Sequence, residues 1–564
     1  MSVFSGRLLR HLGIACLGIG LSLAQGVPPG VQAQDTADPG EIQRRIEQLR
    51  PEPRPEAPPG ILRPAPPPAP GAEISFVLTA VTLEGATVFD PAELGPLYAD
   101  FLARSVTPLE LEEIARRITG RYAEAGYFLS RAVIPPQEVL GGVLRVKVIE
   151  GYIAKVRFEG GLQQESVLEA YRDLFTEERP ARLDTVERAL LLINALPGFS
   201  VEDIQAAALD EDGAHELILA LRHRAVTAEA YLDNRGTPEV GRSQAWSRVA
   251  FNSILGFGEE IHAAVATVPE DTSELVYAEL GLDQPLGVSG AVLGLSVAGS
   301  TIEAGGELAR QQTEARSTTA KGELRYPVLL SRRQAANLRA SFEIRSNTED
   351  RVQTSTIDDR VRVLQLQGDY AIQDDIGGTS FLVLEASQGL DILGASGPDA
   401  PVPSRADADG RFTKFRLDAI RVQDILGPVS LRLAGRGQLA LDPLLSSQEF
   451  LLGGTQFGRG FDFAEISGED GLAGSAELRF GRERDGELLT RYEVYGFYDE
   501  GHLWNDSSPA GSGHEFLRSA GAGLRLNLNP SVQASLEAAK PLNRNVETTG
   551  DRAVRFFFTL SARF

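Results

Sequence analysis

The last eleven residues of the chain, 554–564, alternate between apolar and polar side chains. Counting back from Phe564, every second residue is apolar, whereas Arg563 and Arg555 mark the opposite face and Phe557 is the exception. A period of two places the two sets on opposite faces of a β-strand. Because a sheet edge cannot stay unpaired in hydrocarbon, a strand with one lipid-facing and one polar face predicts a closed membrane barrel. Taken alone, these residues also fit the closing strand of a soluble sandwich.

The same alternation fills the chain from residue 225 to its end, where turn residues separate segments of about ten residues. An even strand number is typical of a bacterial barrel formed by a single chain. We therefore expect a sixteen-stranded antiparallel barrel over residues 225–564. The predicted strands are 227–235, 245–253, 260–268, 274–282, 289–299, 315–326, 337–345, 360–371, 380–387, 412–422, 429–440, 474–480, 491–499, 517–528, 532–539 and 553–563.

The start of the chain has the pattern of a secretory signal peptide, which we place at residues 1–33. Arg7 and Arg10 precede an apolar stretch over 12–24, and small residues precede a predicted cut after Ala33. The only cysteine lies inside that apolar stretch, so the mature chain would contain no disulfide or zinc–cysteine site.

Charge and hydropathy exclude some classes of function. The formal net charge is −23, and loss of the two leader arginines makes it more acidic, which argues against a nucleic-acid partner. After the leader, no uninterrupted apolar run of about 18 residues predicts a membrane-spanning helix. A secreted protein that must still enter a membrane would then do so as a barrel.

Two segments precede the first predicted domain. Residues 34–50 include a short amphipathic helix, in which Ile42, Ile46 and Leu49 share one side. Residues 51–73 are rich in proline and form an expected semi-rigid linker, although a disordered tail would fit the same composition.

Residues 74–150 and 151–224 repeat one order of elements, which predicts two small α+β domains. Each would contain a strand, two helices and two further strands. In the first domain these are 76–83, 91–102, 108–125, 127–134 and 143–149, and in the second 155–158, 165–174, 184–196, 204–209 and 216–221.

One barrel loop is unusually long. About thirty residues separate the predicted strands 429–440 and 474–480, and loops of this length are usually functional or disordered. Glycines flank Arg459 and would let the loop fold back into the lumen. In the strand 491–499, Asp499 shares the inward-facing side with Glu493 and Phe497, so it is a candidate partner for a bidentate ion pair with this arginine. The alternative is a solvated loop arginine and an aspartate that lines a wet pore.

These features together resemble the two-partner-secretion outer-membrane transporters of the ShlB/FhaC/HecB type, within the superfamily of BamA-type assembly factors. The resemblance covers essentially the whole mature chain. The two repeats look like periplasmic POTRA domains, the first of which contains family-like segments at 126–137 and 148–151. The remaining motif residues are Asp233, Asn234, Arg235 and Gly236 in the first barrel strand, Gly458, Arg459, Gly460 and Phe461 in the loop, and Phe497, Asp499 and Gly501 in its partner strand. Gly458 stands where the superfamily usually has valine.

The resemblance implies a translocase of the outer membrane, with its POTRA domains in the periplasm. Its substrate would be a secreted, unfolded exoprotein that the POTRA domains recognise, and the barrel would export it without nucleotide hydrolysis. The helix in 34–50 resembles the family's plug. Outer-membrane lipid and the barrel assembly machinery would be further partners, with Phe564 as the assembly signal.

Three alternative functions belong to other classes of protein. An insertase that assembles other barrels is the nearest, but its members usually carry three or more POTRA domains and lack the motif at 233–236. An enzyme with a barrel anchor would need a catalytic motif, and neither G-x-S-x-G nor H-E-x-x-H occurs. The six histidines are scattered, so we expect no catalytic residue, metal or cofactor. A passive porin would not need two periplasmic modules.

Overall fold

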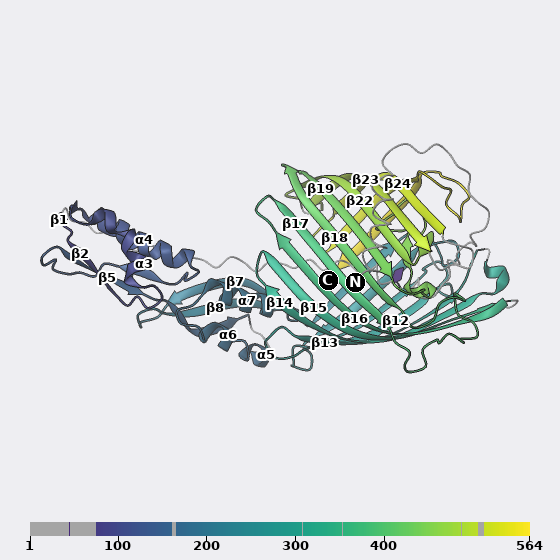
Figure 1. The fold of residues 1–564 in the computed structure, drawn as a ribbon, viewed down its shortest axis with the longest axis horizontal. Coiled ribbons are helices and arrows are strands. Elements are labelled where there is room, and N and C mark those ends of the chain that lie inside the picture. Colours follow the sequence, from purple (N-terminus) through teal and green to yellow (C-terminus); the bar gives the residue numbers. More distant parts are fainter. Residues whose placement is uncertain are drawn as a thin grey trace.

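The computed structural model describes residues 44–45, 75–160, 165–306, 308–351, 354–486, 488–505 and 513–564. The expected leader and linker, and all of the expected plug segment except Arg44 and Arg45, lie outside these residues. Two small α+β domains stand beside a large closed β-barrel (Figure 1).

The first domain packs two helices against a three-stranded sheet. The sheet order is β2-β5-β4, and a separate two-stranded pair joins β1 and β3. Thr107 begins the longer helix, since its hydroxyl accepts a hydrogen bond from the Glu110 amide at 3.4 Å. The elements are β1 (Phe76–Val77), β2 (Ala80–Glu84), α3 (Pro91–Leu94), β3 (Ser105–Val106), α4 (Pro108–Glu124), β4 (Arg131–Val133) and β5 (Val143–Ile149), with 3₁₀ turns at Gly95–Leu97 and Ala99–Phe101.

Three predicted segments of this domain differ from the structure. The expected strand 76–83 is two strands, because the Leu78 amide bonds to the Arg104 carbonyl and redirects the chain. The expected helix 91–102 is one helical turn followed by 3₁₀ turns, because Gly95-Pro96 interrupts it. Of the expected strand 127–134, only β4 forms.

The second domain has the sheet order β6-β8-β7. Leu129 of the first domain lies in its core, so the two domains share packing. The expected helix 165–174 is two short helices. The elements are β6 (Tyr152–Glu159), α5 (Glu165–Glu169), α6 (Asp173–Thr176), α7 (Leu183–Asn194), β7 (Phe199–Ala208) and β8 (Ala214–His223).

The barrel closes through sixteen antiparallel strands, which confirms the predicted fold class. Each predicted strand corresponds to one observed strand, although several observed strands are longer. They are β9 (Val226–Asp233), β10 (Gln244–Asn252), β11 (Glu260–Thr267), β12 (Val276–Pro285), β13 (Val292–Glu303), β14 (Glu314–Leu330), β15 (Gln334–Arg351), β16 (Thr354–Gln373), β17 (Gly378–Gly389), β18 (Thr413–Leu426), β19 (Val429–Ala440), β22 (Asp470–Glu483), β23 (Arg491–Asn505), β24 (Gly513–Asn527), β25 (Val532–Pro541) and β26 (Arg555–Arg563).

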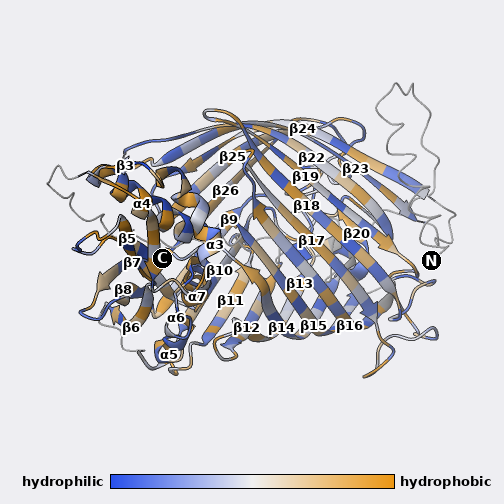
Figure 2. Ribbon diagram, turned by 60° about the vertical axis from the view of Figure 1, so that its left-hand side comes forward, coloured by the Kyte–Doolittle hydropathy of each residue, from blue (hydrophilic) through white to orange (hydrophobic). Residues whose placement is uncertain are grey.

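Side chains alternate between the two faces of the barrel wall. In β12, Leu280 is 62% exposed on the outside, whereas its neighbour Glu279 is 9% exposed inside. Figure 2 shows the resulting alternation of hydrophobic and hydrophilic segments along the barrel strands. None of the helices within the described ranges has the length and apolar character needed to cross a membrane.

The second domain rests on strand ends and short turns at one end of the barrel, which we call the near end. Arg188 of α7 donates to the Pro327 carbonyl at 3.3 Å, and Asn252 of β10 donates to the Arg224 carbonyl at 2.9 Å. Leu192 packs so close to Gly290 that a Cβ there would lie 2.6 Å from its Cδ2. The opposite, far end carries the longer loops, including the one between β19 and β22.

Candidate functional site

The loop between β19 and β22 folds back against the inner wall of the barrel. It contains a short hairpin of β20 (Phe450–Leu452) and β21 (Ile466–Gly468). Apolar side chains of this loop form one buried cluster with wall residues such as Leu503 and Leu517. Burial of this apolar surface holds the loop inside the lumen.

Glycine is required at the tight bends of this loop. Gly453 has φ +108°, and a Cβ there would lie 2.0 Å from the Asp462 carbonyl oxygen. Gly458 has φ +81°, a backbone conformation that valine strongly disfavours. The departure from the usual valine therefore accompanies a left-handed bend directly before Arg459.

Arg459 and Asp499 form a buried bidentate pair. The arginine Nε lies 3.0 Å from Oδ2 of the aspartate, and Nη2 lies 2.9 Å from Oδ1. The backbone amide of Arg459 also donates to Oδ2 at 3.1 Å. The side chains are 6% and 0% exposed. Such a pair is strongly directional, and loss of one partner leaves a buried charge without compensation.

Further wall residues complete the surroundings of the guanidinium. Its Nη1 donates to Glu477 at 2.6 Å, and its Nη2 donates to the Ser475 hydroxyl at 3.1 Å. The guanidinium carbon lies 3.5 Å from the ring centroid of Phe497, within cation–π range. Glu537 lies 3.6 Å from Nη1. The two glutamates and the serine were not among the site residues predicted from the sequence, although all three lie at inward positions of alternating strands.

The other predicted loop and strand residues pack closely around this pair. Phe461 is 1% exposed in the loop cluster. A Cβ at Gly460 would lie 2.8 Å from the backbone of Lys540, and one at Gly501 would lie 2.6 Å from Leu452. These glycines therefore allow the loop to touch β23 and β25.

The motif at 233–236 lies at the far end of β9, and only Asp233 belongs to the strand. Asp233 is fully buried and accepts the Arg235 amide at 3.0 Å. Arg235 pairs with Glu537, stacks 3.9 Å from the Phe557 ring and donates to the Arg459 carbonyl at 3.4 Å. This motif thus contacts the same glutamate and the same loop as the buried pair.

Gly236 allows a close backbone contact beyond β9. Its amide donates to the Arg242 carbonyl at 2.9 Å. A Cβ at this position would lie 1.8 Å from the Gly241 carbonyl oxygen, so only glycine fits.

Two arginines of the expected plug segment are described, and both lie inside the barrel. Arg45 is 3% exposed and contacts Asp233 at 3.1 Å and Gln244 at 2.6 Å. Arg44 donates to the Glu449 carbonyl at 2.6 Å. These contacts join the segment to the start of the barrel sheet and to the long loop.

The closing pair of strands ends at Phe564. Its amide donates to the Ala228 carbonyl at 2.9 Å, and its carbonyl accepts the Ala228 amide at 3.1 Å. The side chain is 66% exposed on the outer wall. Phe564 therefore supplies both a backbone bond at the seam and a lipid-facing aromatic ring.

Two small modules in series with a closed sixteen-stranded barrel are the architecture of a bacterial outer-membrane β-barrel protein. Residues 218–526 match the family described as haemolysin secretion/activation protein ShlB/FhaC/HecB, and residues 76–151 match the ShlB-type POTRA domain. The chain belongs to this family of two-partner-secretion transporters, and the family assignment from the sequence is confirmed.

Curated relatives agree with this assignment. The heme/hemopexin transporter protein HuxB of Haemophilus influenzae strain 86-028NP is 21% identical over 93% of this chain and 95% of its own. The hemolysin transporter protein ShlB of Serratia marcescens is 23% identical over 76% and 75%. The outer membrane transporter CdiB of Escherichia coli strain 536 is 28% identical over 42% and 40%.

Solved structures show the same fold. CdiB from Escherichia coli superposes with a TM-score of 0.71 at 21% identity, over 95% of this chain and 100% of the other. BamA from Haemophilus ducreyi, lacking its POTRA domains 1–3, gives 0.53 at 15% identity, over 87% and 100%. The protein is located in the outer membrane with its POTRA domains in the periplasm. The near end of the barrel is thus periplasmic and the far end extracellular.

Proposed function

We propose that this transporter recognises one unfolded exoprotein through its POTRA domains and exports it through the barrel lumen without nucleotide hydrolysis. The observation that carries the proposal is the position of the long loop. It lies inside the lumen, held by Arg459 and Asp499, while Arg45 bonds to the wall beside it. Export then requires this loop to move.

Free sheet edges of the POTRA domains supply a binding mode for an unfolded chain. In the sheet order β6-β8-β7, the ten-residue strand β7 is an outer strand. An extended peptide that adds to such an edge gains main-chain hydrogen bonds with little dependence on its sequence. This suits a cargo that reaches the periplasm unfolded.

The lumen favours passage rather than tight retention of a peptide. Its wall carries alternating arginines and carboxylates, such as the pair Arg436–Asp418 and the pair Arg416–Glu385. Charges already neutralised by neighbours bind a passing chain weakly, because each contact must displace an existing one. Folding of the cargo outside would give the transport its direction.

A photo-cross-linking experiment tests the recognition step. A photoreactive amino acid at Gln205, an exposed position of β7, should cross-link to the co-expressed cognate exoprotein during export. The same substitution at Arg116, whose side chain is 74% exposed on α4, is the matched control. Equal yields at the two positions, or export that continues without the transporter, would contradict the proposal.

The insertase alternative makes a different prediction. Depletion of an insertase lowers the amount of several unrelated outer-membrane proteins, whereas depletion of a dedicated exporter lowers only its secreted cargo. Quantitative proteomics of outer membranes after depletion separates the two.

A further inference from the structure

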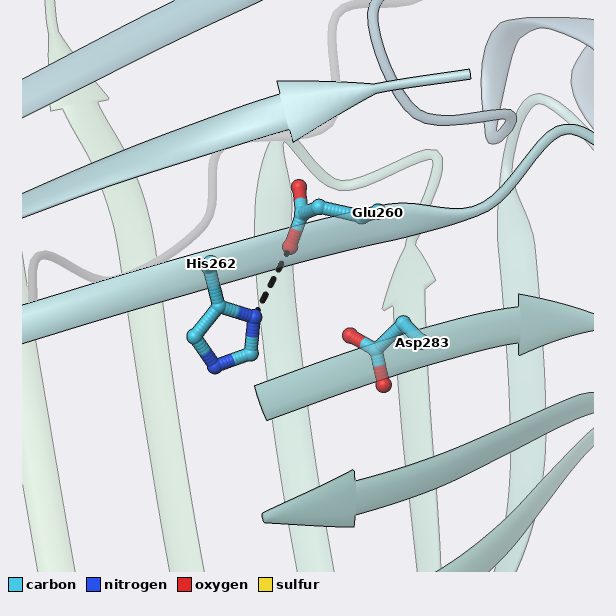
Figure 3. Close-up of side chains that lie close together, drawn as sticks. All are labelled: Glu260, His262 and Asp283. Carbon is cyan, nitrogen blue, oxygen red and sulfur yellow. Dashed lines mark ion pairs between the residues drawn. The ribbon is translucent and has the colours of Figure 1, made fainter. Parts of the chain in front are cut away.

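Three potential metal ligands meet at the periplasmic end of the lumen. Glu260 and His262 come from β11 and Asp283 comes from β12, and their ligand atoms all lie within 4.8 Å of one another. Glu260 and Asp283 are direct partners in the antiparallel register. Figure 3 shows the imidazole of His262 and the two carboxylates close together on these adjoining strands.

Two glycines on neighbouring strands make room for the side chains of His262 and Asp283. Gly281 is the register partner of His262, and a Cβ there would lie 2.3 Å from the imidazole Nε2. Gly294 is the partner of Asp283 on β13, and a Cβ there would lie 2.8 Å from Oδ1. The wall is therefore shaped for an imidazole and a carboxylate at these two positions.

The hydrogen bonding of His262 directs one ring nitrogen towards the cluster. Its Nε2 lies 3.3 Å from the Glu279 carboxylate, which can only accept, so a neutral ring would carry its proton on Nε2. Tyr277 in turn donates its hydroxyl to Glu279. Metal-bound histidines commonly donate their second nitrogen to a carboxylate in this way.

The remaining nitrogen, Nδ1, is left with a lone pair. It is buried and has no hydrogen bond to any residue that the structure describes, in a side chain only 11% exposed. It lies 3.5 Å from the Glu260 Oε1, an oxygen that also accepts from Arg248, and either a metal ion or a proton on Nδ1 would make this contact favourable. Ligand atoms around tetrahedral zinc, with bonds of about 2.0–2.1 Å, are separated by roughly 3.4 Å.

Two arginines lie at the edge of this cluster and pair with its two carboxylates. Arg248 pairs with Glu260, and Arg325 lies 2.6 Å from Asp283 Oδ1. A carboxylate has about four lone-pair positions, so it can bind an arginine and a metal ion together.

We propose that Glu260, His262 Nδ1 and Asp283 form a binding site for a divalent transition metal of the zinc class. A fourth position is then taken by water, and Glu279 orients the imidazole. The site lies directly after the turn 253–259, where a Cβ added at Gly258 would lie 3.1 Å from Cγ1 of Val167 in the second domain. A bound metal would join β11 to β12 beside the POTRA contact. The scattered histidines gave no sign of this site, because its ligands come from two strands.

The rival explanation is a proton on Nδ1, which would make His262 a cation between Glu260 and Glu279. Zinc titration of untagged, full-length protein in detergent distinguishes the two, with calorimetry for affinity and stoichiometry. Visible absorption of added Co²⁺ reports a histidine–carboxylate environment. We expect one tight zinc site per chain at neutral pH.

His262→Gln should weaken this zinc binding by at least about tenfold, and Asp283→Asn should weaken it by a similar factor. His502→Gln is the matched control, because His502 lies near His514 at the other end of the barrel and tests for binding there. Heat-modifiable migration in gels confirms that each variant is folded. Zinc binding that is absent from the wild type, unchanged in His262→Gln, or lost only in His502→Gln would overturn the proposal.

Discussion

The side-chain amide of Asn234 bridges the closing seam of the barrel to Phe558. Its oxygen accepts the Phe558 amide at 2.8 Å, and its nitrogen donates to the Phe556 carbonyl at 3.1 Å. The backbone pairing of β26 with β9 ends at Asp233. The Asn234 side chain therefore adds two further hydrogen bonds to β26 beyond this last pair of residues. A side chain at the end of β9 thus satisfies two backbone groups of β26 beyond the last main-chain pair of the seam.

Asn234→Ala should therefore destabilise the folded barrel by about 1–3 kcal/mol, because it leaves two backbone groups of β26 without partners. The temperature at which the compact gel band disappears measures this effect. Asn337→Ala is a matched control, since Asn337 bonds to Asp369 away from the seam. A larger loss of stability in the control would contradict the role of Asn234.

Arg459→Ala should leave insertion nearly normal and strongly reduce export, because the loop loses its anchor while the sheet keeps its hydrogen bonds. Asp499→Ala should reduce export in the same way. Residues in contact are non-additive, so the double variant should cost little more than either single one in a secretion assay.

Arg416→Ala is the control for this pair, because it removes another lumen arginine, which pairs with Glu385 at 2.8 Å. Normal secretion by Arg459→Ala, or defects that simply add in the double variant, would refute the functional role of the pair.

Deletion of residues 34–50 should raise single-channel conductance while the barrel stays folded. Arg45→Ala alone should raise it in part, because the variant loses the bonds to Asp233 and Gln244. Planar-bilayer recordings measure both changes. Equal conductance with and without the segment would mean that it does not obstruct the pore.

Deletion of Phe564 should lower the amount of heat-modifiable protein in the outer membrane. The last lipid-facing aromatic ring is lost together with two backbone bonds to Ala228. Quantified immunoblots of membrane fractions report the folded amount. Substitution of Phe564 by tyrosine keeps the ring and the backbone, so it should retain most of the wild-type level.

Glu150 should make POTRA 1 sensitive to acid. Burial raises the pKa of this carboxyl, but hydrogen bonds from Thr87, Val88 and Tyr122 outweigh burial and hold the pKa below its usual value of 4.5. A lowered pKa in the folded state stabilises the domain above pH 4.5, and this contribution is lost as the pH falls through the folded-state pKa.

Glu150→Gln should accordingly speed limited proteolysis of POTRA 1 at pH 7, with a smaller difference from the wild type in acid. The exposed Glu124→Gln serves as its control. Cleavage of Glu150→Gln at the wild-type rate at pH 7 would count against this role.

Much of the barrel was predictable from the sequence, because each strand places one side chain in lipid and the next in the lumen. That alternation depends only on neighbouring residues, so it was visible in the sequence for all sixteen strands. It also placed Asp499 on the inner face, and the glycines around Arg459 marked a loop able to turn inward. The helices of the POTRA domains were less predictable, since Gly95-Pro96 broke an otherwise helical pattern.

Only the tertiary structure decided which distant groups meet. Glu477 and Glu537 reach Arg459 because the long loop, β22 and β25 converge in the lumen. Asn234 meets Phe556 across 322 positions of sequence because the first and last strands close the barrel. His262 meets Asp283 through the register of β11 and β12. Alternation determines the face of each side chain, whereas register and closure determine its neighbours, and these depend on the packing of the whole barrel.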